Sequence, residues 1–89
     1  GDLHDEIIDE CERRGWIYFH SSMAHRTRRT EGEPDFHIWA DGGRKFAFEC
    51  KSKSGKLSTP QLGIIAHAKK LGHTVHVIGN LEEFLELIK

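Results

Sequence analysis

The apolar residues of this 89-residue chain change their spacing along the sequence, and the changes predict alternating helices and strands. Apolar positions three or four residues apart predict a helix from Leu3 to Arg14, which Asp2 can cap. The aromatic and β-branched run at residues 16–20 predicts a strand. The polar segment that follows, residues 21–33, has no apolar periodicity and is expected to be a loop.

The middle of the chain has the pattern of a β-hairpin. Residues 35–40 and 45–51 predict two strands, because the turn Asp41-Gly42-Gly43 lies between them and glycine tolerates the positive φ that tight turns need. Each of the two tryptophans, Trp16 and Trp39, lies within an apolar strand, so both are expected in the core.

The last third of the chain predicts a helix, a strand and a second helix. Ser58 and Gln61 have the spacing of a capping box, and the helix that they begin is expected to reach Leu71. Residues 74–78 form the next predicted strand, and Asn80 can cap the final helix. The order of elements implies an α/β fold in which helices flank both faces of a mixed sheet.

Length and composition set broad limits on the class of protein. Eighty-nine residues, 37% hydrophobic and 30% charged, fit one compact domain over residues 1–89. No apolar run is long enough to span a membrane, and no secretory signal is visible, so a cytoplasmic location is expected. Cys11 and Cys50 lie far apart without a CxxC pair, which favours reduced thiols over a disulfide.

The formal net charge is only -1, but the charges are segregated along the chain. Residues 13–30 carry five arginines and no acid, and residues 42–73 carry seven bases against Glu49 alone. Two basic blocks on either side of an acidic one suit phosphate contacts around a metal site, although solvated loops share this pattern. The candidate nucleic-acid contacts are Arg26, Arg28, Arg29, Lys53 and Lys56.

Three residues of the predicted hairpin have the chemistry of a metal site. Because side chains alternate along a strand, Glu49 and Lys51 share one face. Asp35 begins the partner strand and lies across from Glu49 if the hairpin pairs in register. Oxygen ligands without a Cys/His cage favour Mg²⁺ or Mn²⁺. Such an ion polarises a phosphate and activates water, while Lys51 is suited to orient that water or neutralise charge on the phosphate.

Each residue of this constellation also has an ordinary structural interpretation. Asp35 alone is as well explained as a turn residue after Pro34. Glu49 and Lys51 taken alone fit an exposed ion pair better than a site. The predicted register of Asp35 with Glu49 is what favours the functional interpretation.

The same residues belong to an ordered set of motifs that covers nearly the whole chain. Gly32-Glu33-Pro34-Asp35, Phe48-Glu49-Cys50-Lys51, Gly55-Lys56-Leu57-Ser58 and Gln61 together resemble a VRR-NUC domain, a branch of the PD-(D/E)xK nucleases. The resemblance implies a restriction-endonuclease-like αβββαβ core followed by a C-terminal helix. It also implies dependence on a divalent metal and cleavage of DNA.

The resemblance assigns a role to each motif residue. Asp35 and Glu49 become the metal ligands together with the backbone carbonyl of Cys50, and Lys51 becomes the catalytic lysine. Gln61 becomes a residue that supports the site, although its place in the capping box explains it equally well.

A further acid is expected from the first helix. Glu6 matches the acid that the family has in its N-terminal helix, as a catalytic residue and metal ligand. Glu10 lies one turn further along the same face and is the alternative. Glu33, at the variable position of the G-x-P-D motif, adds an acid beside the site for which the sequence offers no physical reason.

The leading functional hypothesis is a structure-specific DNA endonuclease. A domain of this size has one active site, so paired cuts in a four-way (Holliday) junction would require a homodimer. Stand-alone members of the family, typically from bacteriophages, resemble junction resolvases, which suggests a bacterial or phage-infected host cell. The alternatives are a flap-cutting or nicking nuclease, and a non-catalytic DNA-binding module of the same fold.

Overall fold

A computed structural model describes residues 2–21, 30–51 and 54–89 of the chain, and every helix and strand predicted from the sequence is present in it. The boundaries differ from those predicted by about one residue, as is usual for element ends. In chain order the elements are α1 (Leu3–Arg14), β1 (Ile17–His20), β2 (Phe36–Trp39), η2 (Asp41–Gly43), β3 (Lys45–Cys50), α2 (Thr59–Lys70), β4 (Val75–Ile78) and α3 (Leu81–Leu87).

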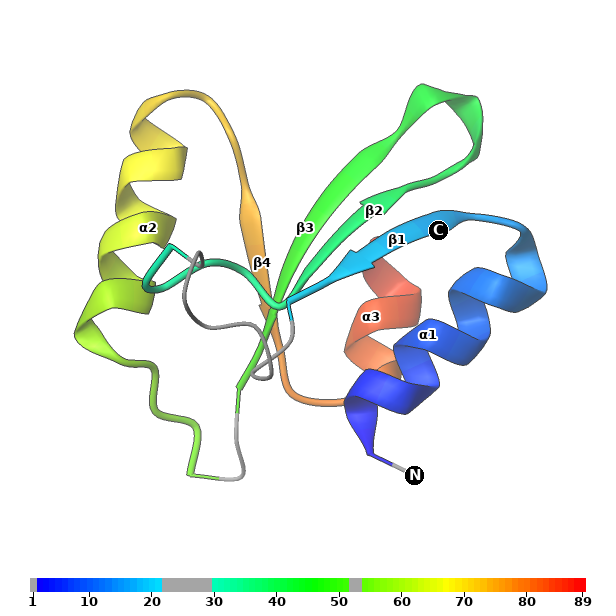
Figure 1. The fold of residues 1–89 in the computed structure, drawn as a ribbon, viewed down its shortest axis with the longest axis horizontal. Helices are drawn as coiled ribbons and strands as arrows, with labels where there is room; N and C mark the ends of the chain where they lie inside the picture. Colours follow the sequence, from blue (N-terminus) through cyan, green and yellow to red (C-terminus); the bar gives the residue numbers. More distant parts are fainter. Residues whose placement is uncertain (1, 22–29, 52–53) are drawn as a thin grey trace.

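The four strands form one mixed sheet in the order β1-β2-β3-β4. The first three are antiparallel neighbours, and β4 runs parallel to β3 after the crossover through α2. Figure 1 shows α2 on one side of the sheet and α1 with α3 on the other. The fold is therefore α/β, with a mixed sheet between helices and a C-terminal helix, which confirms the predicted class.

The helices begin where the sequence predicted their caps. The side chain of Asp2 accepts the Asp5 N–H at 2.9 Å, and that of Asn80 accepts the Glu83 N–H at 2.9 Å. Ser58 opens α2 with the predicted capping box. The longest helices have 12 residues, and none in the described part of the chain is long and apolar enough to cross a bilayer.

The main core lies between the sheet and the pair α1 and α3. The rings of Phe48 and Phe84 meet there at 5.0 Å between centroids. Burial of each such side chain contributes roughly 1.5–3 kcal/mol. The fully buried apolar side chains of this core are Ile7, Cys11, Phe36, Ile38, Phe48, Ile78, Phe84 and Ile88.

The opposite face of the sheet is packed more loosely. No residue of α2, which the structure describes in full, is buried. A groove of about 700 Å³ remains between α2 and the sheet, with Ile64 and Leu71 on the helix side and Ala47 and Val75 on the sheet side. One face of the domain is thus a closed core, and the other is partly open.

The expectation that both tryptophans are buried is wrong for Trp39. Trp16 is 9% exposed, but Trp39 is 48% exposed. Ile38 points into the main core, so strand alternation turns Trp39 to the opposite face, where it lines the open groove beside α2. Lys45 lies across from it in the register of β2 with β3, with its ammonium 5.8 Å from the indole ring.

Both cysteines are free thiols, as predicted. Cys11 is buried in the core, and this burial raises the pKa of its thiol to about 11. Cys50 is half-buried at the end of β3, and burial, with contributions from Asp35 and Glu49, raises its pKa to about 12. Both groups are therefore neutral thiols near neutral pH.

The segment that leads into β2 packs its backbone directly against the start of α2. Gly32 has φ +83°, and a Cβ added there would overlap the carbonyl group of Pro60 and lie 2.9 Å from Gln61 N. Backbone atoms cannot move away as a flexible side chain can. Gly32 is therefore required both for its conformation and for this close approach.

We predict that Gly32→Ala lowers the free energy of unfolding by on the order of 3 kcal/mol, because left-handed strain and a backbone clash add together. Urea denaturation would measure the loss. Gly42→Ala is the matched control: its φ is +68°, but nothing lies within 4 Å of its Cβ position. The control should lose only about 1 kcal/mol. Equal losses in the two variants would contradict the role of the contact with α2.

Candidate active site

The pairing of β2 with β3 brings Asp35 to Glu49. Phe36 pairs with Phe48, so the next step of the same antiparallel register sets Asp35 opposite Glu49. The Asp35 carboxylate turns toward this strand, where its Oδ2 accepts the N–H of Cys50 at 2.8 Å. The hairpin has the register that a two-carboxylate site requires.

Glu49 is the one buried charged residue in the part of the chain that the structure describes, with 1% of its surface exposed. It pairs with Val77 of β4 and, by alternation, points to the face covered by α2, away from the main core. Removing a carboxylate from water is costly, and such burial is a feature of functional sites more often than of surfaces. The interpretation of Glu49 as part of an exposed ion pair is therefore wrong.

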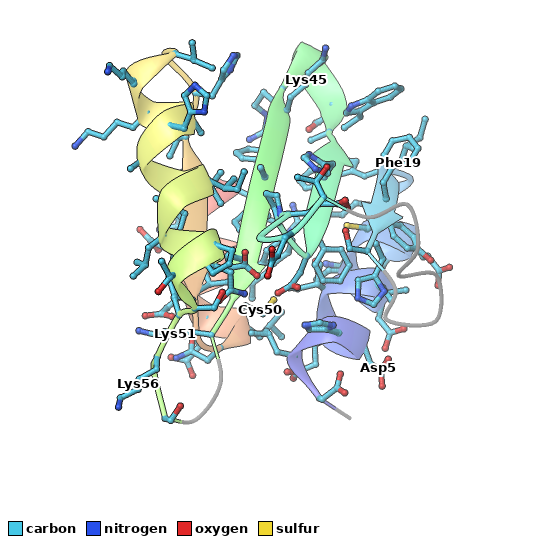
Figure 2. The ribbon with its side chains drawn as sticks, turned by 60° about the vertical axis from the view of Figure 1, so that its left-hand side comes forward. Asp5, Phe19, Lys45, Cys50, Lys51 and Lys56 are labelled. Atoms are coloured by element: carbon cyan, nitrogen blue, oxygen red, sulfur yellow. The ribbon has the colours of Figure 1, made fainter. Side chains whose placement is uncertain are left out.

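Lys51 continues β3 by one residue. Its N–H donates to the carbonyl of Ile78 at 2.9 Å, so the backbone stays extended and alternation puts Lys51 on the same face as Glu49. Figure 2 shows Cys50 and Lys51 together at the end of β3, with Lys51 on the side of α2. The side chain is exposed, as contact with a substrate would require.

Sequence reasoning missed the glycine that makes room for Lys51. A Cβ on Gly79 would lie 3.0 Å from Lys51 Cε, so the aliphatic stem of the lysine passes directly over this residue. The N–H of Gly79 donates to Glu83 Oε1 at 2.6 Å, which holds the backbone in place. The signal available in the sequence was the position of Gly79, between the predicted strand at residues 74–78 and the helix cap Asn80.

Sequence reasoning also missed His4. Its Nε2 lies 3.7 Å from Asp35 Oδ2, and its Nδ1 lies 2.9 Å from His20 Nε2. Burial lowers the pKa of His20, and the neighbouring His4 adds to the effect. The signal in the sequence was position: His4 falls on the same helical stripe as Ile7 and Cys11, which are buried.

The structure does not bring the expected acid of the first helix to Asp35. Glu6 is exposed and lies two positions after His4, which is a rotation of about 200° around α1. Glu10 is engaged elsewhere, since its carboxylate lies 2.6 Å from Arg13 and 2.7 Å from Arg14. Hydrogen bonds from these two arginines lower the pKa of Glu10.

Gln61 is used in the capping box of α2. Its Oε1 accepts the N–H of Ser58 at 2.7 Å, and its own N–H donates to the Ser58 hydroxyl at 3.2 Å. The backbone of Gln61 is also where Gly32 packs. These contacts explain the residue structurally, and its support of the site remains a prediction.

Glu33 has a structural reason for its place in the G-x-P-D motif. The hydroxyl of Ser21 lies 2.5 Å from Glu33 Oε2 and 3.0 Å from the carbonyl of Pro34. The N–H of Ser21 donates to the carbonyl of Asp35 at 2.9 Å. Glu33 thus fastens the end of β1 to the segment that carries Asp35.

The predicted nucleic-acid contacts are only partly described. Lys56 is exposed in the connection between β3 and α2. Arg26, Arg28, Arg29 and Lys53 lie outside the residues that the structure describes. Their contact with a nucleic acid remains a prediction.

The donor atoms at this site fit a divalent cation. Asp35 and the buried Glu49 contribute two carboxylates from neighbouring strands, and hard oxygen donors are the ligands that Mg²⁺ and Mn²⁺ prefer. The carbonyl of Cys50, predicted as a third ligand, belongs to the residue whose N–H binds Asp35. The register sets Asp35 and Glu49 on neighbouring strands beside Cys50, and their joint binding of one ion remains a prediction.

Comparison with known proteins supports the fold through a solved structure and not through a sequence match. No protein-family model matches the chain, and no curated protein matches it. One solved structure, described as a VRR_NUC domain, has a TM-score of 0.74 and 23% sequence identity over 97% of this chain and 89% of that one. The chain therefore has the fold of a VRR_NUC domain, a restriction-endonuclease-like αβββαβ core with a C-terminal helix, as its ordered motifs predicted.

Proposed function

We propose that the chain is a metal-dependent nuclease domain of the PD-(D/E)xK type that cuts DNA. The observation that carries this proposal is the register that sets Asp35 opposite the buried Glu49, with Lys51 two residues further along the same strand. A surface ion pair needs no buried carboxylate and no second acid on the neighbouring strand. The VRR_NUC fold supports the same reaction class.

Each residue of the site has a defined part in the proposed reaction. Asp35 and Glu49, with the carbonyl of Cys50, hold Mg²⁺ or Mn²⁺. The ion supplies Lewis-acid polarisation of the scissile phosphate. Lys51 places its ammonium beside the phosphate, where it orients the attacking water and offsets negative charge that develops in the transition state.

The remaining predicted residues act around this centre. Gln61 supports the site by fixing the start of α2, against which Gly32 packs. The exposed Lys56 binds phosphate next to the site, in common with the four other basic residues predicted above. Contacts between these basic residues and phosphates do not depend on the base sequence of the DNA, which suits an enzyme that recognises the shape of its substrate.

The preferred substrate that we propose is branched DNA, with the four-way junction first. Symmetrical cuts in two strands require two active sites, and one domain of this size has room for one. Because each copy supplies one active site, a homodimer is the expected working form. Branched DNA arises during replication and repair in the cytoplasm of a bacterial or phage-infected cell.

An exposed apolar patch on β1 and β2 supports the dimer. Ile17, Phe19 and Trp39 share one sheet face and are 54%, 48% and 48% exposed. The rings of Phe19 and Trp39 meet edge to face at 5.1 Å between centroids. Large aromatic residues are enriched at the centres of protein interfaces. This β1–β2 patch is the surface that we assign to the second copy.

Cleavage of labelled four-way junction, flap and plain duplex DNA, with and without Mg²⁺ or Mn²⁺, tests the reaction. Metal-dependent cuts should fall by about a hundredfold or more in Asp35→Asn, Glu49→Gln and Lys51→Ala. Asn in place of Asp35 keeps an acceptor for the Cys50 N–H, so charge is removed with little change in structure.

Glu82→Gln is the matched control, because Glu82 is exposed on α3 and its variant should cleave as the wild type does. Binding of DNA without cuts in either metal would favour the non-catalytic module. Preference for flap or nicked products would keep the site and replace the substrate.

Sedimentation tests the dimer separately from the chemistry. The wild type should sediment with twice the 10.2 kDa of one chain, and Trp39→Ser should raise the dimer dissociation constant by on the order of tenfold or more. Leu62→Ser is the control, since Leu62 is also 54% exposed but belongs to α2 and not to the strands that carry the patch. A strict monomer, with no dimer on junction DNA, would refute the homodimer.

A further inference from the structure

Three potential metal ligands from distant parts of the chain meet at the N-terminal end of α1. A ring nitrogen of His4, a carboxylate oxygen of Asp35 and the sulfur of Cys50 all lie within 4.8 Å of one another, and each residue is half-buried. They come from α1, from the segment before β2 and from the end of β3. The fold alone brings them together.

The surroundings of His4 orient its ring. Its Nδ1 lies 2.9 Å from Nε2 of His20, and the ring of His20 stacks on the buried Phe36 with centroids 4.4 Å apart. When His4 Nδ1–H donates to His20, His4 Nε2 carries the lone pair. That atom faces Asp35 Oδ2 at 3.7 Å, which is too long for a hydrogen bond.

We propose that His4 is a nitrogen ligand of the metal ion that Asp35 also binds, and that it makes the site selective for divalent transition-metal ions over Mg²⁺. This inference rests on the proposed metal-dependent function and deepens it. A histidine whose second ring nitrogen is held by a hydrogen bond is the usual arrangement of an imidazole ligand.

The chemistry of the donors decides the class of ion. Imidazole suits Zn²⁺, Fe²⁺ and Ni²⁺, and Co²⁺ lies between Fe²⁺ and Ni²⁺ in the order of affinities, whereas Mg²⁺ takes oxygen ligands and keeps much of its water. The sulfur of Cys50 lies in the same cluster, but the inference concerns the nitrogen of His4 and the oxygen of Asp35, which face each other at 3.7 Å. An acid at the position of His4 would instead favour Mg²⁺.

Metal binding measured without DNA tests the inference. Titration calorimetry and the visible absorption of bound Co²⁺ would be recorded for the wild type, His4→Ala and His4→Glu, with Mg²⁺ affinity taken from competition. Loss of the imidazole in His4→Ala should weaken Co²⁺ binding by about tenfold or more and leave Mg²⁺ binding nearly unchanged. His4→Glu should lower the ratio of Co²⁺ to Mg²⁺ affinity and change the Co²⁺ spectrum.

Two further variants make the outcomes distinct. His67→Ala removes an exposed histidine of α2 and should bind Co²⁺ as the wild type does. Asp35→Asn should lose binding of both ions. Loss in Asp35→Asn with unchanged Co²⁺ affinity in His4→Ala would overturn the inference and keep the proposed function. No metal binding by the wild type would overturn both.

Thermal melts in chelator would verify that each variant folds. If His4→Ala does not fold, His4→Gln takes its place.

Discussion

The register of β2 against β3 is the constraint on which the site depends. Phe36 and Ile38 pair with Phe48 and Phe46, and these side chains face α1 and α3. A slip of one residue would turn the apolar set of one strand to the opposite face and destroy the main core. The same register sets Asp35 opposite Glu49. The placement of Asp35 opposite Glu49 is thus enforced by hydrophobic burial of the residues next to them in the two strands, Phe36 and Phe48.

The two faces of the sheet differ in how tightly they are packed. The face toward α1 and α3 is closed and supplies most of the stability, while the face toward α2 keeps a groove and the exposed patch that includes Trp39. Glu49 and Lys51 belong to the second face. Its geometry depends on backbone contacts, such as that of Gly32 with Pro60, because few buried side chains hold α2 in place. Two of the proposed catalytic residues, Glu49 and Lys51, therefore lie on the more loosely packed face.

Local patterns in the sequence predicted nearly all of the fold, because caps, turns and strand alternation act over a few residues. The shared face of Glu49 and Lys51 is of this kind. What failed depended on contacts between distant segments. Burial of Trp39 depends on how closely α2 packs on the sheet, where a groove remains, and the structural role of Glu33 depends on a bond to Ser21. Such pairings have no signature in spacing alone.

The first helix shows why a motif match can misplace a residue. Burial of Ile7 and Cys11 fixes the rotation of α1, and His4 lies within about 60° of both around the helix axis. Glu6 lies about 200° from His4, so to reach Asp35 the helix would have to turn Ile7 out of the core. That rotation would cost roughly 1.5–3 kcal/mol for Ile7 alone. In this chain, therefore, α1 brings His4 and not Glu6 to Asp35, which is why we propose an imidazole as the ligand from this helix.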